Sequence, residues 1–281
     1  MIYFKSLEEV RAIREGGWRL GNILQTLKEA AKPGVSTIFI EDLANKMIAE
    51  IGGRTAFKNY PMGDGIYFPS TVCISINNEV VHGAAYPERI FQSGDIVDLD
   101  IGMEWPVDKK WRQKLNLPVN QYSKYGGFFT DTCLTVAIGP VSTAARRLLK
   151  VTRECLTRGL TAAQPGATIN DIGRAVQDYA ESHGYGVVRD LVGHGVGYFA
   201  HEKPDVVNFA IRPNSADNVT LKPGMVIAIE PMINIGTEDV IVADNDYTIL
   251  TADNSLSAHF EHTVAILEDG NEVLTAPSDK S

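Results

Sequence analysis

The sequence predicts an α+β fold in which helices pack on one face of an antiparallel sheet. Three observations lead to this prediction. First, segments with apolar residues at helical spacing are interspersed with runs of Val, Ile and Leu typical of strands. Second, two of these predicted strands end in a carboxylate. Third, the same order of elements occurs twice along the 281 residues. A repeated order of this kind predicts two halves with similar arrangements.

Four helices are predicted, two in each half of the chain. Ser6 begins the first and is followed by Glu9, which together form a capping box, and Pro-Gly or Gly-Gly pairs end the first three helices. Their expected limits are Ser6 to Pro33-Gly34, about Ile38 to Ile51, about Ser142 to Pro165-Gly166, and Thr168 to Gly184. Each half therefore opens with a helix, a Pro-Gly turn and a second helix.

The two predicted strands that end in a carboxylate lie in matching contexts. SGDIVDLDIG places Asp100 six residues after its Gly, and PGMVIAIEPM places Glu230 six residues after its Gly. Each strand has a His-Gly pair upstream and a second strand with a carboxylate downstream, and these residues are His82, His194, Asp131 and Glu261. Both carboxylate pairs are 31 residues apart (131 − 100 and 261 − 230). Much of the first interval is a polar, aromatic stretch over about residues 104–127, which we interpret as an elongated hairpin loop. The equal spacing is therefore treated as partly accidental.

This order predicts a single domain built from halves over about residues 1–141 and 142–281, paired by a pseudo-twofold axis. Such a pairing brings four carboxylates together inside an apolar sheet, where repulsion and desolvation require positive charge or protonation. Two divalent cations would supply a charge of +4, which balances the −4 of four ionised carboxylates. Such cations are coordinated by carboxylate oxygen and imidazole nitrogen. His194, expected in a loop between two glycines, offers such an imidazole.

Each residue taken alone also has a purely structural interpretation. Asp100 is compatible with a solvated strand position, as is Asp98 on the same face. Glu230 is compatible with an ion pair at a strand end, Asp131 with a turn, and His194 with an ordinary loop histidine. The repeated order of His-Gly and two strand carboxylates favours the metal site over these separate explanations.

Composition narrows the partners and the compartment. The chain has 26 basic and 35 acidic residues, a net charge of −9 and no Lys/Arg run, which argues against a nucleic-acid partner. Its cysteines, Cys73, Cys133 and Cys155, are odd in number and form no CxxC motif, so a reducing compartment is expected. The N-terminus turns polar after four residues and no stretch reaches 18 apolar residues. We therefore expect a cytoplasmic protein without signal peptide or membrane span.

The chain resembles the type I methionine aminopeptidases, which share the pita-bread fold with prolidase, aminopeptidase P and creatinase. The segments that carry the resemblance occur in the family's order, and they are CISINNEVVHG, SGDIVDLDIG, FTDT, LVGHGVGYFAHEKP, IAIEPMIN and SAHFEHTVAI. The resemblance covers nearly the whole chain. It implies removal of the initiator methionine from nascent proteins and peptides with a small second residue, through attack of a dimetal-bound hydroxide on the first peptide carbonyl.

The resemblance also implies a ligand set for two divalent ions. Mn, Fe or Co suit these ligands, and Zn is a further option. Asp131 and Glu261 are expected to bridge the ions, Asp100 to chelate one of them, and His194 and Glu230 to bind the other. Glu230 is further expected to handle the proton of the attacking water.

Two histidines and three pocket residues complete the implied site. His82 resembles the residue that hydrogen-bonds near the substrate amine and scissile amide, and His201 the one that contacts the substrate backbone. Cys73, Phe68 and Tyr247 are candidates for the methionine pocket. For each histidine a structural role is as compatible with the sequence as substrate binding. For Cys73 a position in the hydrophobic core is nearly as compatible as one in the methionine pocket.

Three departures from the family bear on specificity. Ala200 precedes His201 where the family commonly has an aromatic residue, and the segments 60–69 and 104–127 are longer than usual. If the second segment disturbed strand pairing, Asp131 would be the ligand most affected. Its Trp105 and Trp111 could serve as a lid, a partner contact or local packing.

Two other functions remain open at this stage. A non-catalytic pita-bread protein would bind ribosomes, RNA or other proteins, but all five ligands are present and no basic patch is seen. An aminopeptidase with altered first-residue preference is motivated by Ala200 and the longer segments. The partners expected from the resemblance are peptides or nascent chains with N-terminal Met, with transient ribosome association as an open question, and the expected state is a monomer.

Overall fold

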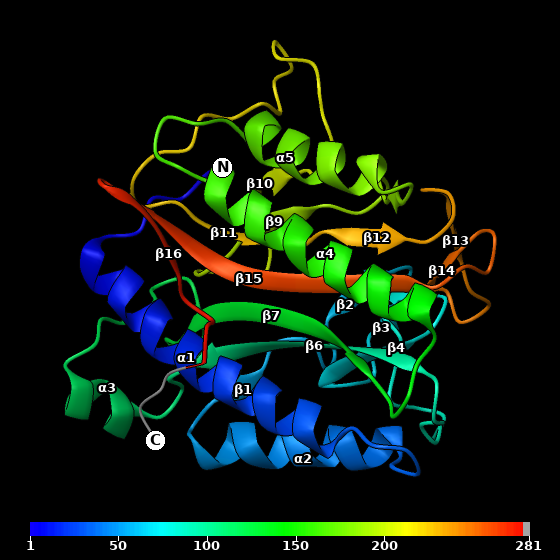
Figure 1. Cartoon of the computed structure of the whole chain (residues 1–281). Helices are drawn as coiled ribbons and strands as arrows, with labels where there is room; N and C mark the ends of the chain where they lie inside the picture. The colour runs from blue at the N-terminus through cyan, green and yellow to red at the C-terminus, as the bar shows by residue number, and fades with distance from the viewer. Residues whose placement is uncertain (278–281) are drawn as a thin grey trace.

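The computed structural model describes residues 1–277, which form helices layered against a large sheet (Figure 1). The helices are α1 Leu7–Ala30, α2 Thr37–Glu50, α3 Lys109–Leu115, α4 Thr143–Ala162 and α5 Ile169–Ser182. In the described part of the chain, none of them is long and apolar enough to cross a bilayer.

The main sheet is built by antiparallel pairing of strands from both predicted halves. Its strands are β1 Arg54–Thr55, β4 Val72–Ile76, β6 Ile96–Trp105, β7 Phe128–Ala137, β8 Gly186–Val187, β9 Gly193–Gly195, β10 Glu202–Val206, β11 Val226–Ile229, β12 Met232–Asn234, β15 Ser257–Leu267 and β16 Gly270–Val273. The central order is β1-β6-β7-β15-β11-β9-β10. The strand β15 therefore lies between β7, from the first part of the chain, and β11, from the second.

Two small sheets lie beside the main one. One contains β5 Glu79–Val81, β13 Val240–Val242 and β14 Ile249–Thr251, and the other is the hairpin of β2 Pro61–Gly63 and β3 Ile66–Tyr67. The pairing of β14 with β5 again joins segments far apart in the sequence.

The two faces of the main sheet differ in character because side chains alternate along each strand. On β6, Leu99 and Ile101 are fully buried in the same apolar core as Ile13 and Leu20 of α1. Figure 1 shows α1 and α4 crossing this face. The opposite face of β6 carries Asp98, Asp100 and Glu104, all buried. An apolar helix-covered face and a polar inner face position the site.

Close packing of α1 depends on glycine. A Cβ at Gly17 would lie 2.4 Å from the carbonyl oxygen of Leu274, and one at Gly21 would lie 2.3 Å from that of Thr275. Any side chain at these positions would force the helix away from the C-terminal segment. The two glycines thus allow α1 to lie directly on residues 274 and 275.

The predicted helices are confirmed to within a few residues at each end, and so is the α+β class. Ser6 and Glu9 form the expected capping box, and Thr168 forms another with Asp171. The division into halves over residues 1–141 and 142–281 stays a prediction, although strands from both sides share one sheet.

Three local predictions need correction. The stretch 104–127 does connect the antiparallel strands β6 and β7, as expected of an elongated hairpin loop, but β6 continues through Trp105 and residues 109–115 form α3. Asp100 lies in the middle of β6 rather than at its end. The Asp108 side chain caps α3 by accepting a hydrogen bond from the Lys110 amide. His194 lies in the short strand β9 rather than in a loop, since its two glycine neighbours pair with β10 and β11.

Candidate metal centre

The five residues expected to bind metal line one cavity of about 280 Å³ on the polar inner face of the sheet. Four come from strands, with Asp100 on β6, Asp131 on β7, His194 on β9 and Glu261 on β15. The fifth, Glu230, directly follows β11. His82 and His201 line the same cavity.

Strand register explains why these side chains meet. Asp100 and Glu261 both lie opposite Cys133 of β7, and Asp131 lies opposite Gly102 of β6. Residues paired across antiparallel strands project to the same face. The ladder between β6 and β7 is unbroken from Ile96–Ala137 to Trp105–Phe128, so the long segment after β6 does not displace Asp131.

The donor atoms approach one another at the distances that a shared cation requires. His194 Nε2 lies 3.5 Å from Glu230 Oε1 and 4.0 Å from Asp131 Oδ2. One donor atom from each of Asp131, His194 and Glu261 falls within 4.8 Å of the others. His194 Nδ1 lies 2.9 Å from the carbonyl oxygen of Gly195, to which it can donate, leaving Nε2 with a lone pair for a cation.

Burial makes this group of carboxylates unfavourable without added positive charge. Desolvation and neighbouring carboxylates raise the pKa of Asp100, Glu230 and Glu261 well above the usual range. Desolvation also raises the pKa of Asp131 to about 7. Among the described residues, the buried oxygens Asp100 Oδ1, Asp131 Oδ1, Glu230 Oε1 and Glu261 Oε1 have no hydrogen-bond partner. Acceptor-only oxygens that converge without donors fit divalent cations.

The two further histidines are held as neutral imidazoles near this cluster. Desolvation lowers the pKa of His82 to about 4 and, with the nearby His194, lowers the pKa of His201 to about 3. The ring centroids of His194 and His201 are 4.3 Å apart. His201 Nδ1 lies 2.8 Å from the Tyr60 hydroxyl, which fixes the orientation of the ring.

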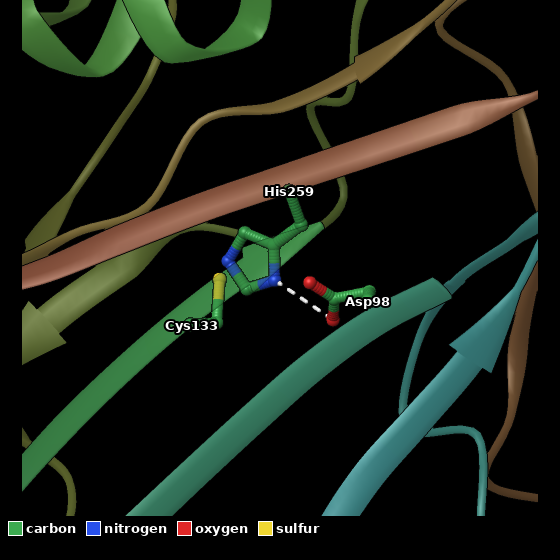
Figure 2. Close-up of side chains that lie close together, drawn as sticks. All are labelled: Asp98, Cys133 and His259. Carbon is green, nitrogen blue, oxygen red and sulfur yellow. Dashed lines mark ion pairs between the residues drawn. The ribbon is translucent and has the colours of Figure 1, made fainter. Parts of the chain in front are cut away.

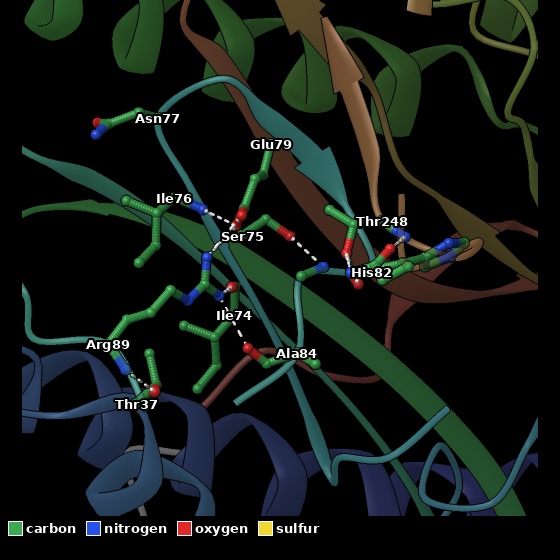
Figure 3. A network of polar contacts seen from close by, with 12 residues as sticks. Thr37, Ile74, Ser75, Ile76, Asn77, Glu79, His82, Ala84, Arg89 and Thr248 are labelled. Carbon is green, nitrogen blue, oxygen red and sulfur yellow. Dashed lines mark hydrogen bonds and ion pairs between the residues drawn. The ribbon is translucent and has the colours of Figure 1, made fainter. Parts of the chain in front are cut away.

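A polar network holds the chain around His82, whose backbone has a left-handed φ of 59° (Figure 3). The Thr248 hydroxyl donates to the carbonyl oxygen of His82 at 3.0 Å. Arg89 bonds both carboxylate oxygens of Glu79 at 2.6 and 2.8 Å and also donates to the carbonyl oxygens of Ile74 and Ala84. The segment after β5 is therefore anchored on both sides of His82.

One wall of the cavity is apolar, and sequence reasoning found only part of it. Phe68 and Cys73 line the cavity as proposed, together with Phe57, Tyr60 and Met62, which were missed. The unusual length of the segment just before Cys73 could have indicated this wall, because the segment contributes Tyr60, Met62 and Phe68. The Tyr247 ring packs behind Phe68, with centroids 5.7 Å apart.

His201 has an aromatic neighbour although Ala200 stands where the family commonly has an aromatic residue. Ala200 is buried, and Phe199 is 39% exposed on the surface. Tyr60 supplies an aromatic ring beside His201 instead, with centroids 4.9 Å apart. A residue 141 positions earlier in the chain thus contacts the ring directly.

The other long segment, about residues 104–127, does not line the cavity. Trp105 is fully buried and donates to the carbonyl oxygen of Ile51 at 2.9 Å. Trp111 packs on it, with ring centroids 5.9 Å apart, and Arg19 lies over both rings. The two tryptophans serve local packing, one of the three roles considered for them.

The model of metallopeptidase family M24 matches residues 11–107 and 119–268, which is most of the chain. The chain belongs to metallopeptidase family M24. The family model does not cover residues 108–118, which include the whole of α3. Metallopeptidase chemistry implies divalent metal ions, in agreement with the donor set described above.

Methionine aminopeptidases are similar to this M24 chain along nearly their whole length. A methionine aminopeptidase of Clostridium acetobutylicum is 40% identical over 275 residues, covering 98% of this chain and 99% of the relative. The crystal structure of a methionine aminopeptidase from Thermotoga maritima is 33% identical with a TM-score of 0.85, covering 98% of this chain and 99% of that one. The prolidase of Pyrococcus horikoshii, 18% identical over 64% of its chain, has a TM-score of 0.71. The fold is therefore the pita-bread fold.

Proposed function

We propose that this M24 chain is a methionine aminopeptidase, which removes the N-terminal methionine from peptides and proteins by metal-dependent hydrolysis. The observation that carries the proposal is the convergence of four buried carboxylates and an imidazole beside an apolar wall. The full-length similarity to methionine aminopeptidases supports the same activity.

We assign the metal ligands as follows. Asp131 and Glu261 would serve as ligands to both of two divalent ions, Asp100 would hold one of them, and His194 and Glu230 would hold the other. Bound there, the ions would activate a water molecule and stabilise the negative charge that develops on the carbonyl oxygen. Glu230 would take up the proton of that water, and its buried Oε1 has no hydrogen-bond partner among the described residues.

The neutral imidazoles of His82 and His201 bind the substrate backbone. A neutral ring offers one donor and one acceptor nitrogen, which suits a peptide amide. The Tyr60 hydroxyl engages Nδ1 of His201, so Nε2 is the nitrogen left for the substrate. His82 acts near the substrate amine and the scissile amide.

The apolar wall selects the first residue of the substrate. Phe57, Met62, Phe68 and Cys73 provide the kind of surface that a methionine side chain buries favourably. A narrow site next to the scissile bond would admit only a small second residue. The substrates we propose are nascent proteins and peptides that begin with Met and a small residue, in the cytoplasm, with Mn, Fe, Co or Zn as the bound ions.

Amino-acid release from Met-Ala-Ser, Leu-Ala-Ser and Ala-Ala-Ser tests the proposal. Protein stripped with a chelator should regain activity with Mn²⁺ or Co²⁺ and release Met alone. Glu230→Gln should lower kcat by about 10²- to 10⁴-fold, the usual contribution of a general base. Glu238→Gln, on an exposed side chain, is the matched control.

The alternatives predict different outcomes. Release from all three peptides would indicate a broader aminopeptidase, which Ala200 and the long 60–69 segment motivate. No release with any cation would favour the non-catalytic binding protein. Identical rates for Glu230→Gln and the parent would contradict the assigned role of Glu230.

A further inference from the structure

Asp98, Cys133 and His259, whose side chains Figure 2 shows, form a second cluster beside the candidate metal centre, and His259 lines the same cavity. Their exposed fractions are only 2%, 3% and 2%. Each lies two residues along its strand from a proposed ligand, so strand alternation places it on the same inner face. The sequence carried this signal, since Asp98 precedes Asp100 and His259 precedes Glu261 by two positions.

The imidazole of His259 faces one carboxylate with each nitrogen. Nδ1 lies 3.5 Å from Asp98 Oδ2, and Nε2 lies 3.7 Å from Glu230 Oε2. Within residues 1–277, neither nitrogen has a hydrogen-bond partner, nor has Asp98 Oδ2. Hydrogen bonds of this type span about 2.7–3.2 Å, so side-chain shifts on the order of 0.5–1 Å would make both contacts hydrogen bonds.

The two oxygens of Glu230 face different partners. Oε1 lies 3.5 Å from His194 Nε2, inside the group of proposed ligands, whereas Oε2 points to His259. An imidazole that engages Oε2 leaves only Oε1 for the metal centre. Hydrogen bonds from residues behind the ligands commonly fix the orientation of metal-binding carboxylates in this way.

We propose that His259, oriented by Asp98, is a positioning residue for Glu230 that engages Oε2 and keeps Oε1 directed at the metal centre. The inference rests on the proposed function, in which Glu230 binds one of two cations. Within that function it explains why a buried histidine and a further buried aspartate stand beside the ligands.

Stepwise Co²⁺ titration of chelator-stripped protein tests the proposal, by calorimetry and visible absorption at one neutral pH. In His259→Gln, one Co²⁺ equivalent should bind about 10- to 100-fold more weakly, with an altered visible spectrum, while the other equivalent is unchanged. Asp98→Asn should act in the same direction. The double variant should be no worse than His259→Gln, because Asp98 acts through His259.

His262→Gln is the matched control, since it removes an imidazole from the same strand. His262 faces away from the cavity and contacts the Thr275 hydroxyl at 2.9 Å. Its Co²⁺ affinities should stay within about two-fold of the parent, because it touches no proposed ligand. With Met-Ala-Ser, His259→Gln should lower kcat while KM changes little, and His262→Gln should leave both unchanged.

Two results would overturn the positioning role. One is a His259→Gln protein that binds both equivalents as the parent does. The other is a third Co²⁺ equivalent with a thiolate charge-transfer band that Cys133→Ser abolishes, because Asp98, Cys133 and His259 would then hold an ion themselves. If Glu230→Gln bound Co²⁺ as the parent does, that result would instead contradict the proposed function, on which the positioning role depends.

Discussion

At His262, a single side chain links the stability of the fold to pH. The residue follows Glu261 on β15 but projects to the helix-covered face, where Nδ1 meets the Thr275 hydroxyl. Desolvation lowers its pKa from 6.5 to about 4. The unfolded chain therefore takes up a proton near pH 6.5 that the folded chain accepts only near pH 4. Stability from the neutral ring is complete above pH 6.5 and decreases as pH falls toward 4.

At pH 5 the free energy of unfolding is lower by about 2 kcal/mol, because His262 is mostly protonated in the unfolded chain and mostly neutral in the folded one. Urea unfolding of the metal-free parent and of His262→Gln, each at pH 7.5 and pH 5, measures it. The variant should lose about 2 kcal/mol less than the parent over this interval, because all other groups titrate alike in both proteins. Equal losses would contradict the lowered pKa of His262.

Individual site residues were predictable where the sequence repeats a pattern. Asp100 and Glu230 follow apolar strand residues in the same sequence context, and His194 lies in a glycine-flanked segment before Glu230. Tyr60 and His259 were missed because their roles depend on contacts between distant segments. No local pattern shows that Tyr60 reaches His201, or that strand register places His259 against Glu230.

At the scale of elements, local signals decided which predictions succeeded. The long helices carry caps and stop signals that can be read directly, such as the capping box of Ser6 and Glu9. The helix α3 has no comparable apolar repeat, and none of its residues is buried. It forms where Asp108 caps it and Trp111 packs on Trp105, a contact between residues that the sequence pattern does not relate.

The segment after β6 is held to the sheet chiefly by Glu104. This buried carboxylate accepts hydrogen bonds from Arg54 at 2.7 and 3.0 Å and from the Gly127 amide at 3.2 Å, and it also bonds the Ser123 hydroxyl. Asn120 adds bonds to the carbonyl oxygens of Gly127 and Tyr198. The segment is thereby fixed without contacting the cavity.

We expect Glu104→Ala to loosen residues 119–127 and to destabilise the fold by about 1–3 kcal/mol, because the buried Gly127 amide loses its acceptor. Hydrogen exchange followed by mass spectrometry should show faster exchange there. Co²⁺ affinity should be unchanged, since the ladder of β6 and β7 positions Asp131. Glu88→Ala, at an exposed position, is the control. Unaltered exchange, or loss of Co²⁺ binding, would contradict this account of the segment.

For the whole molecule, the fold class followed from the sequence because alternation and helix caps are local properties. The pairing of strands could not be obtained in the same way. The contacts of β15 with β7 and β11 join residues more than a hundred positions and about thirty-five positions apart, respectively. Whether the two halves form one domain with pseudo-twofold symmetry stays a prediction.

The carboxylates at the centre should make the stability of the entire fold depend on cations. Each ion bound only by the folded state adds about 2.7 kcal/mol at a hundred times its Kd. Chelation should therefore lower the Tm, and Mn²⁺ should restore it, as measured by thermal melting with and without EDTA. Stripped Asp131→Asn should melt above the stripped parent, because one repelling charge is removed, and should gain less from Mn²⁺. A Tm insensitive to EDTA would contradict this expectation.

The position of β15 in the sheet determines when the metal centre can form during synthesis. This strand joins the two groups of strands and carries Glu261, yet Glu261 is made 161 residues after Asp100 (261 − 100). A growing chain that has completed β7 holds Asp100 and Asp131 but neither the imidazole of His194 nor the glutamates. Contacts so distant in sequence form late in folding. Each new copy would thus acquire its cations, and with them its activity, only after β15 itself has been translated.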